Sequence, residues 1–161
     1  GSALVAEVVQ SAVKMPASKF LQQQLLLPLD IQDYRLHYNP HGTLNTAGGS
    51  EYRSRDLLKL GQLCLNKGEW NGKQIISGEW ISKATSPKAN AWKGMDYGYL
   101  MWLRSYGGVP CYAMSGNGGQ KVMGIPELDA VLVITTTNYG NRKAHGYTDE
   151  LVEKYIVPAL K

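Results

Sequence analysis

The chain has 161 residues, of which 43% are hydrophobic and 19% are charged, and its formal net charge is +4 at pH 7. These values are typical of a globular protein with a hydrophobic core, and they exclude an intrinsically disordered chain. Basic and acidic residues are interspersed without a basic block, so we predict no nucleic-acid partner. No apolar run reaches the length of a membrane span, and we expect no membrane segment. The sequence has no signal-peptide pattern, and Gly1-Ser2 is either a natural start or a cloning scar.

Cysteine and histidine positions bear on metals and cofactors. Cys64 and Cys111 lie far apart and predict either two buried free thiols or a single disulfide. The three histidines, His37, His41 and His145, have no metal-ligand spacing such as H-E-x-x-H. We therefore predict no metal site and no cofactor.

Residues 1–92 predict a region that is mainly helical. Apolar periodicity and helix-start signals occur in four stretches, which are 3–13, 17–26, 54–68 and 78–86. Between the second and third of these, residues 27–50 have no sustained period and predict a long connection. The pair Asn71-Gly72 is a turn signal.

Residues 93–161 predict strands followed by a helix. Aromatic and β-branched residues dominate four runs, which are 97–105, 109–114, 120–125 and 130–138. Residues 148–160 have the pattern of an amphipathic helix that can cover one face of a sheet. The order predicts one α/β (α+β) domain over 1–161, with helices first, then an antiparallel sheet of three to four strands, then a C-terminal helix.

The most informative stretch is YAMSGNGGQ, residues 112–120, in which small residues interrupt the predicted sheet. Glycine lets a backbone turn sharply or approach a ligand closely, so the stretch is either a loose hairpin or one wall of a site. A phosphate-binding loop is disfavoured, because such a loop precedes a helix and the residues after this one predict a strand. The nearby aromatic residues favour core packing over a substrate wall; they are Tyr97, Tyr99, Trp102 and Tyr112.

Two short motifs match the catalytic groups of penicillin-recognising enzymes. Ser11 and Lys14 form an S-x-x-K match, and Tyr139 and Asn141 form a Y-x-N match. The nucleophile of such an enzyme belongs at the start of a helix, whereas Ser11 lies near the end of its predicted helix. About one S-x-x-K is expected by chance in a chain of this composition. We therefore predict that neither match is catalytic.

Three longer stretches, residues 46–81, 97–102 and 115–140, resemble in order and spacing the C-terminal half of serine hydrolases related to class C β-lactamases. That family includes D-alanyl-D-alanine carboxypeptidases and esterases, and the resemblance extends to the segment PLDI at residues 28–31. It implies part of a β-lactamase/transpeptidase-like fold, with the active site between an α/β sandwich and a helical region. It also implies a two-step acyl transfer, in which a serine attacks a carbonyl and water releases the acyl-enzyme.

The resemblance places the third motif of that family, K-T-G or a variant, at residues 114–116, followed by the donor of an oxyanion-hole N–H. Catalytic roles fall on Ser115, Gly116 and Asn117. Substrate-binding roles fall on Met114, Gly118, Gly119, Gly48 and Gly49, a plain turn being the alternative for the last two. Many members have Lys or His where this chain has Met114, and a thioether cannot donate a hydrogen bond to a substrate carboxylate. The departure disfavours β-lactam hydrolysis and favours an ester, amide or peptide substrate.

By the same resemblance, residues 3–16 correspond to the helix that follows the family's Y-x-N motif, so both S-x-x-K and Y-x-N are expected upstream of Gly1. We therefore predict part of a periplasmic or secreted serine hydrolase that is inactive alone. The alternative is a non-catalytic peptidoglycan- or peptide-binding module of the same fold. A third reading is a chain that self-associates or pairs with a separate chain carrying the missing half.

Overall fold

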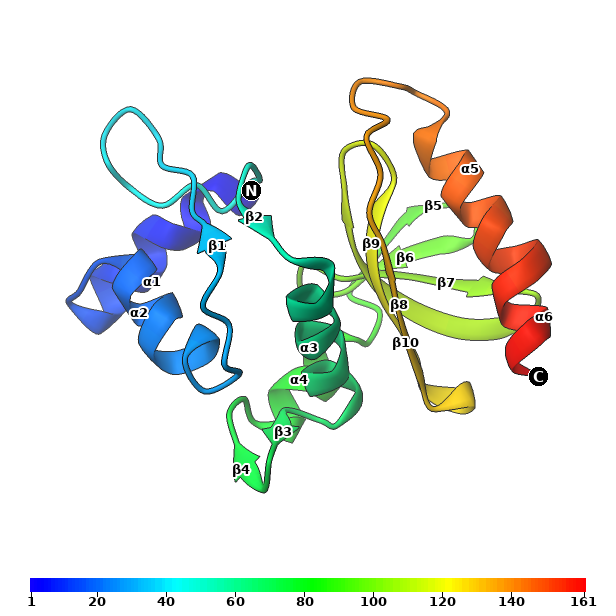
Figure 1. The fold of residues 1–161 in the computed structure, drawn as a ribbon, viewed down its shortest axis with the longest axis horizontal. Coiled ribbons are helices and arrows are strands. Elements are labelled where there is room, and N and C mark those ends of the chain that lie inside the picture. The colour runs from blue at the N-terminus through cyan, green and yellow to red at the C-terminus, as the bar shows by residue number, and fades with distance from the viewer. The chain divides into compact units, whose positions relative to one another are not determined.

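The computed structural model describes residues 1–161. The chain is divided into two compact units, Gly1–Asp56 and Leu57–Lys161, whose elements are labelled in Figure 1. None of the helices has the length and apolarity that a bilayer crossing requires.

The first unit consists of short helices and one two-stranded ladder. Its elements are a 3-10 turn (Ser2–Leu4), α1 (Val5–Val13), α2 (Ala17–Leu21), a π-helical turn (Gln22–Leu26), β1 (Tyr34–Arg35) and β2 (Glu51–Tyr52). Because β1 pairs antiparallel with β2, most of the predicted long connection is a loop between two paired strands. The core contains Ala6, Ala17 and Leu44, with Val9, Leu21 and Leu36 packed against them.

α3 (Ser54–Leu65) begins at the end of the first unit and continues into the second. Gly68 closes this helix, because its φ is +84° and its N–H donates to the Leu63 carbonyl at 2.7 Å. A Cβ on Gly68 would lie 1.9 Å from the Ile76 carbonyl oxygen, so no side chain fits there. The predicted helix stop at this glycine is confirmed.

A hairpin and a short helix follow α3. β3 (Glu69–Trp70) pairs with β4 (Lys73–Gln74), and both residues of the Asn71-Gly72 turn have positive φ, as the turn signal predicts. α4 (Gly78–Ala84) begins after Ser77, whose Oγ accepts a hydrogen bond from the Trp80 N–H at 3.2 Å.

The remainder of the second unit is built on one antiparallel sheet in the order β10-β9-β8-β7-β6-β5. Its strands are β5 (Ala89–Trp92), β6 (Met95–Tyr97), β7 (Trp102–Tyr106), β8 (Val109–Gly116), β9 (Gln120–Ile125) and β10 (Ala130–Ile134). Each strand pairs with its neighbour in sequence, so the sheet is a meander. It has six strands, and the prediction of three to four strands was wrong.

The additional strands are β5 and β6. β5 lies within residues 1–92, which the sequence pattern predicts as mainly helical, and β6 is separated from β7 by a reversal inside the run 97–105, which the pattern predicts as one strand. The Gly98 N–H donates to the Met101 carbonyl at 2.8 Å, and Leu100 has a φ of +61°. A Cβ on Gly98 would lie 2.0 Å from the Ala84 carbonyl oxygen, so the end of α4 packs directly on this turn. The division into β6 and β7 thus depends on a tertiary contact that a local pattern does not contain.

Side chains that alternate along the strands form two separate cores, one on each face of the sheet. One face is covered by α5 (Ala144–Leu151), a π-helical turn (Val152–Ile156) and α6 (Val157–Leu160), as Figure 1 shows. The core on this α5 face consists of Tyr106, Val109, Cys111, Ala113, Met123, Ile125, Val152 and Val157. The core on the α3/α4 face consists of Cys64, Ile81 and Tyr112, with Ile76, Met101, Leu103 and Met114 packed against them. The two cysteines are therefore buried free thiols in different cores, and the disulfide alternative is excluded.

Candidate active-site hairpin

The predicted third motif lies where β8 extends beyond its neighbour β7. Pairing between β7 and β8 ends at Ala113, which is opposite Trp102. Pairing between β8 and β9 continues to Gly116, which is opposite Gln120. Residues 114–116 therefore have a partner strand on one side only, and their other edge is free of β7.

The free edge carries backbone donors and acceptors. The Gly116 carbonyl accepts a hydrogen bond from the Gly119 N–H at 3.3 Å, so it points into the turn and not toward the free edge. Neighbouring residues of a strand direct their N–H and C=O groups to opposite sides. The backbone groups of Ser115 therefore point toward the edge that β7 leaves free.

The three glycines of this turn, Gly116, Gly118 and Gly119, differ in whether the fold leaves room for a side chain. Gly118 and Gly119 have φ values of +85° and +87°, a region that favours glycine. A Cβ on Gly119 would lie 2.6 Å from the Ala144 carbonyl oxygen, and one on Gly118 would lie 3.3 Å from the Tyr139 nitrogen. A Cβ on Gly116 would meet only the Gln120 side chain, at 3.4 Å. The fold thus requires glycine at 118 and 119 but has room for a side chain at 116.

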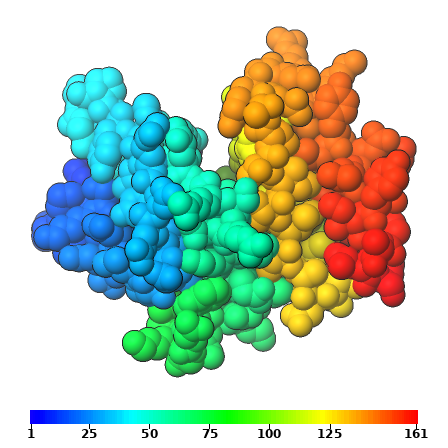
Figure 2. Space-filling model, in the orientation of Figure 1, coloured from blue at the N-terminus to red at the C-terminus, as the bar shows by residue number.

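The segment 135–143, here called the docked loop, packs on this turn on its way from β10 to α5 (Figure 1). The Gln120 side-chain amide donates to the Thr136 carbonyl at 2.7 Å and accepts from the Thr136 N–H at 2.9 Å. The Thr136 hydroxyl donates to the Gly118 carbonyl. The Gly140 N–H donates to the Asn117 Oδ1 at 3.3 Å. The space-filling view shows the loop, in orange, at the surface of the second unit (Figure 2).

The docked loop was not predicted, because residues 135–138 continue the β-branched pattern of β10. The strand ends at Ile134, after which Gln120 pairs with the chain through its side chain. A glutamine at the start of a strand has no sequence signal that would distinguish this role from a solvent-exposed one.

The side chains of Met114 and Ser115 belong to opposite faces of the sheet. Met114 packs against the core of the α3/α4 face. Ser115 is paired across the strands with Lys121 and shares the α5 face with it. Met114 therefore contributes packing, and Ser115 lies next to a buried charge.

That charge belongs to an ion-paired network around Asp149 of α5. Its carboxylate contacts Lys121 Nζ at 2.8 Å and Arg104 Nη1 at 2.7 Å, and it accepts a hydrogen bond from the Tyr106 hydroxyl at 2.7 Å. Burial raises the pKa of Asp149, but the hydrogen bonds from Lys121 and Tyr106 and the charges of Lys121 and Arg104 outweigh it and hold that pKa below its usual range. Burial, together with the Asp149 carboxylate, raises the pKa of Tyr106. The Lys121 side chain is thus held by Asp149 of α5.

The two glycines predicted for the opposite rim lie in the first unit. A Cβ on Gly49, whose φ is +89°, would lie 3.0 Å from the His37 ring. Gly48, with a φ of +152°, has open space around it. The hairpin thus brings together Met114 through Gly119, whereas Gly48 and Gly49 belong to a separate loop, and their substrate-binding role stays a prediction.

The S-x-x-K match and the Y-x-N match lie at the positions that the sequence predicts, one at the end of a helix and the other after the last strand. Ser11 lies in the last turn of α1, and Lys14 follows that helix in the left-handed conformation, with a φ of +56°. Both are exposed. Tyr139 and Asn141 belong to the docked loop, and both are exposed.

The nearby aromatic residues are divided between core and surface. Tyr112 is buried, and Trp102 contacts Tyr97 edge-to-face with ring centroids 4.6 Å apart. Tyr99 is half-exposed and stacks on Trp80 at 5.3 Å. Core packing is thus correct for Tyr112, while Tyr99 lies at the surface.

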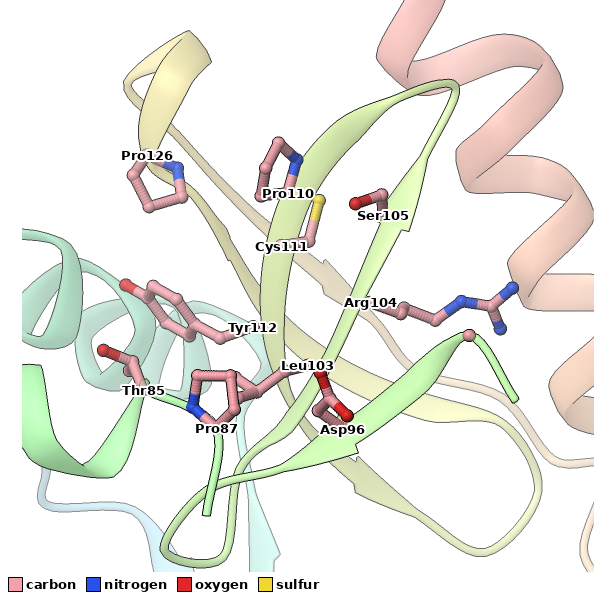
Figure 3. A pocket seen from close by; sticks show the side chains of 11 residues that line it. Thr85, Pro87, Asp96, Leu103, Arg104, Ser105, Pro110, Cys111, Tyr112 and Pro126 are labelled. Carbon is pink, nitrogen blue, oxygen red and sulfur yellow. The ribbon is translucent and has the colours of Figure 1, made fainter. Parts of the chain in front are cut away.

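A pocket of about 450 Å³ is lined by Tyr112, the first residue of the hairpin, but not by the predicted motif residues (Figure 3). It is lined by Thr85, Pro87, Gly94, Asp96, Leu103, Arg104, Ser105, Pro110, Cys111, Tyr112 and Pro126. Figure 3 shows Arg104 pointing away from the other lining side chains, which agrees with its ion pair to Asp149. No residue of 114–119 lines this pocket. No group of three or more His, Cys, Asp or Glu side chains is placed to hold a metal ion.

Comparison with known proteins gives matches among solved structures only, since no family model and no curated protein matches the chain. A penicillin-binding-protein homologue from Caulobacter crescentus is 11% identical, with a TM-score of 0.77 over 97% of this chain and 56% of its own. A β-lactamase from Mycobacterium bovis is 17% identical, with a TM-score of 0.71 over 96% of this chain and 62% of its own. An octameric penicillin-binding-protein homologue from Pyrococcus abyssi is 17% identical, with a TM-score of 0.69 over 92% of this chain and 40% of its own.

These matches extend over nearly all of this chain but only about half of each solved structure. At such low identity they establish the fold and not the activity. Residues 1–161 therefore form part of the fold that these β-lactamase and penicillin-binding-protein homologue structures share.

Proposed function

We propose that the chain is part of a β-lactamase-like serine hydrolase and contributes one wall of its active site, the hairpin 112–120. A serine nucleophile from another part of the full-length protein attacks an ester, amide or peptide carbonyl, and water then releases the acyl-enzyme. The Asn117 N–H stabilises the oxyanion, and Ser115 contacts the substrate. A serine hydrolase of this kind needs no cofactor.

The observation that carries the proposal is the free edge of β8 beside a glycine that the fold itself does not require. Residues 114–116 have no partner strand on the β7 side, so backbone groups of that edge are available to a ligand. A Cβ on Gly116 would meet only one flexible side chain of the protein. A glycine there is explained if an acyl group has to lie against the strand. A preorganised donor at a developing oxyanion typically lowers the barrier by about 3 kcal/mol.

Met114 directs the choice of substrate and also favours the alternative function. Its side chain packs in the α3/α4 core and has no hydrogen-bond donor for a carboxylate. We therefore expect esters or amides to be better substrates than β-lactams. The same departure favours a non-catalytic peptidoglycan- or peptide-binding module as the second candidate.

The test uses the full-length protein that contains these residues and a fluorophosphonate probe, which labels activated serines. We expect labelling and hydrolysis of p-nitrophenyl esters by the full-length protein, and neither by the 161-residue chain alone. The Ser11→Ala variant of the full-length protein serves as the control and keeps its labelling.

Two results would change the conclusion. Labelling of the 161-residue chain that disappears in Ser11→Ala would contradict the proposal and make Ser11 the nucleophile. A full-length protein that binds peptidoglycan peptides but is never labelled would establish the binding module.

A further inference from the structure

Gln120 extends the β9–β10 ladder with its side chain after the backbone pairing has ended. The last backbone pair joins Lys121 to Ile134. Beyond it, the Gln120 amide meets both backbone groups of Thr136, at 2.7 and 2.9 Å. A carboxamide has one donor side and one acceptor side, so it can replace a peptide group in such a pairing. The side chain thus fixes the start of the docked loop where no strand partner remains.

Once Thr136 is held there, its contacts hold the turn. Its hydroxyl donates to the Gly118 carbonyl, and farther along the loop the Gly140 N–H donates to Asn117 Oδ1. Gly118 also lies against the loop backbone, since a Cβ on it would be 3.3 Å from the Asn138 carbonyl carbon. Of residues 117–119, which connect β8 to β9, Asn117 and Gly118 are therefore hydrogen-bonded to the docked loop that Gln120 anchors.

We propose that Gln120 is a positioning residue for the candidate active-site hairpin: its side-chain amide anchors the docked loop, and the loop fixes the conformation of residues 116–119. The role in catalysis rests on the proposed function, because it assigns the oxyanion donor to Asn117 in that turn. The effect on the turn is a property of this chain alone. Gln120 touches no substrate in this proposal and acts only through the loop.

The experiment compares backbone amide hydrogen exchange, measured by NMR, in the 161-residue chain and its Gln120→Met variant. Methionine has a similar length but replaces neither hydrogen bond, so we expect the Gly119 amide, which donates to the Gly116 carbonyl within the turn, to exchange about thirtyfold faster. Amides in the middle of β8 and β9 should keep their exchange rates. Gln120→Glu keeps the acceptor and loses the donor, so its effect should be smaller.

Gln74 provides a matched control. Its amide nitrogen donates to the carbonyls of Lys67 and Ile76 at 2.8 and 2.6 Å, and so it also joins backbone segments. Gln74→Met should speed exchange near the β3–β4 hairpin and leave residues 116–119 unchanged.

Two outcomes would overturn the positioning role. One is unchanged exchange at the Gly119 amide in Gln120→Met. The other is a uniform increase over the whole sheet, which would make Gln120 an ordinary contributor to stability.

A second measurement separates this inference from the proposed function. In the full-length protein, Gln120→Met should lower kcat for ester hydrolysis by about tenfold with little change in KM, because the oxyanion donor is misplaced only in the transition state. An unchanged kcat together with faster exchange would overturn the catalytic role. If the full-length protein has no acyl-transfer activity, the proposed function fails, and the exchange data still decide whether Gln120 fixes the turn.

Discussion

Gly119 and Gly116 lie three residues apart in one turn, yet the fold constrains them differently. Gly119 combines a φ of +87° with a backbone oxygen 2.6 Å from the position of its Cβ. Gly116 has ordinary contacts only, the nearest at 3.4 Å. Gly119 is therefore a glycine that the fold requires, whereas the fold leaves room for a side chain at Gly116.

We predict that Gly119→Ala lowers the free energy of unfolding by about 3 kcal/mol, because it adds left-handed strain and a clash with the Ala144 carbonyl. Gly116→Ala should change it by less than about 1 kcal/mol. Urea unfolding followed by circular dichroism measures both variants. Equal destabilisation would show that Gly116 is also a folding requirement.

The two thiols give a second prediction at this scale. Burial raises the pKa of Cys64 and of Cys111 to about 11 each, with a smaller contribution from Glu127 at Cys111. Only the thiolate reacts, so at pH 8 both should react with Ellman's reagent more than about a hundredfold more slowly than in denaturant. Both thiols should react fully in urea. Fast reaction of either thiol in the native chain would contradict its burial.

At the scale of elements, Asp149 anchors α5 to two strands of the sheet. Lys121 of β9 has only 4% of its side chain exposed, and Asp149 is the partner of its ammonium group. Arg104 of β7 contacts the other carboxylate oxygen. The helix that covers this face is thus held by charges as well as by its apolar side chains.

We predict that Asp149→Asn destabilises the chain by about 3 kcal/mol, because it leaves the Lys121 charge buried without its counter-charge. Glu150→Gln is the control, since Glu150 pairs on the surface with Lys154 and should leave unfolding unchanged. Chemical denaturation of the three proteins makes the comparison. Equal losses of unfolding free energy in the two variants would mean that the buried ion pair stabilises the chain no more than the surface pair does.

The same carboxylate predicts a dependence on pH. The pKa of Asp149 in the folded chain lies below its usual value, which it has in the unfolded chain. At a pH between these two values, the unfolded chain therefore binds more protons than the folded chain. The stabilisation is therefore fully present above the unfolded pKa of about 3.9 and is lost as the pH falls through the folded pKa. The stability of the wild-type chain should fall more steeply than that of Asp149→Asn below about pH 4. Parallel curves from urea titrations across that range would contradict this assignment.

At the scale of the whole molecule, the two ends of the sheet differ. β5 is a short edge strand with an irregular register between Asn90 and Trp92, a feature that discourages further pairing. β10 is the other edge strand, and its sequence AVLVI has no charge, proline or bulge. An edge of this kind is prone to pair with another chain.

We therefore predict that the 161-residue chain self-associates at micromolar concentration through β10. Sedimentation velocity over a range of concentrations measures this directly. A monomer at every concentration would show that the β10 edge is not open to a second copy.

Part of the fold follows from local sequence. The Asn71-Gly72 turn, the helix stop at Gly68 and the C-terminal helix depend on turn chemistry and periodicity within a few residues, and these predictions were correct. The strand count was wrong because β5 lies in a region whose sequence predicts helices, and because the reversal at Gly98 that separates β6 from β7 packs on the carbonyl of Ala84. The likeness to the fold of β-lactamases and penicillin-binding-protein homologues was also predicted from the sequence, by the order and spacing of three stretches.

For the candidate site, the sequence by itself determined the hairpin 112–120 and predicted a family motif at residues 114–116; the catalytic roles of Ser115 and Gly116 and the substrate-binding role of Met114 stay predictions. Only the tertiary structure decided what holds that hairpin. The bonds from Gln120 to Thr136 join residues 16 positions apart, and the pair of Arg104 with Asp149 joins residues 45 apart. A local pattern reports φ preferences and burial periodicity, whereas a side-chain amide or a buried ion pair is defined by its partner, which the fold brings from a distant part of the chain.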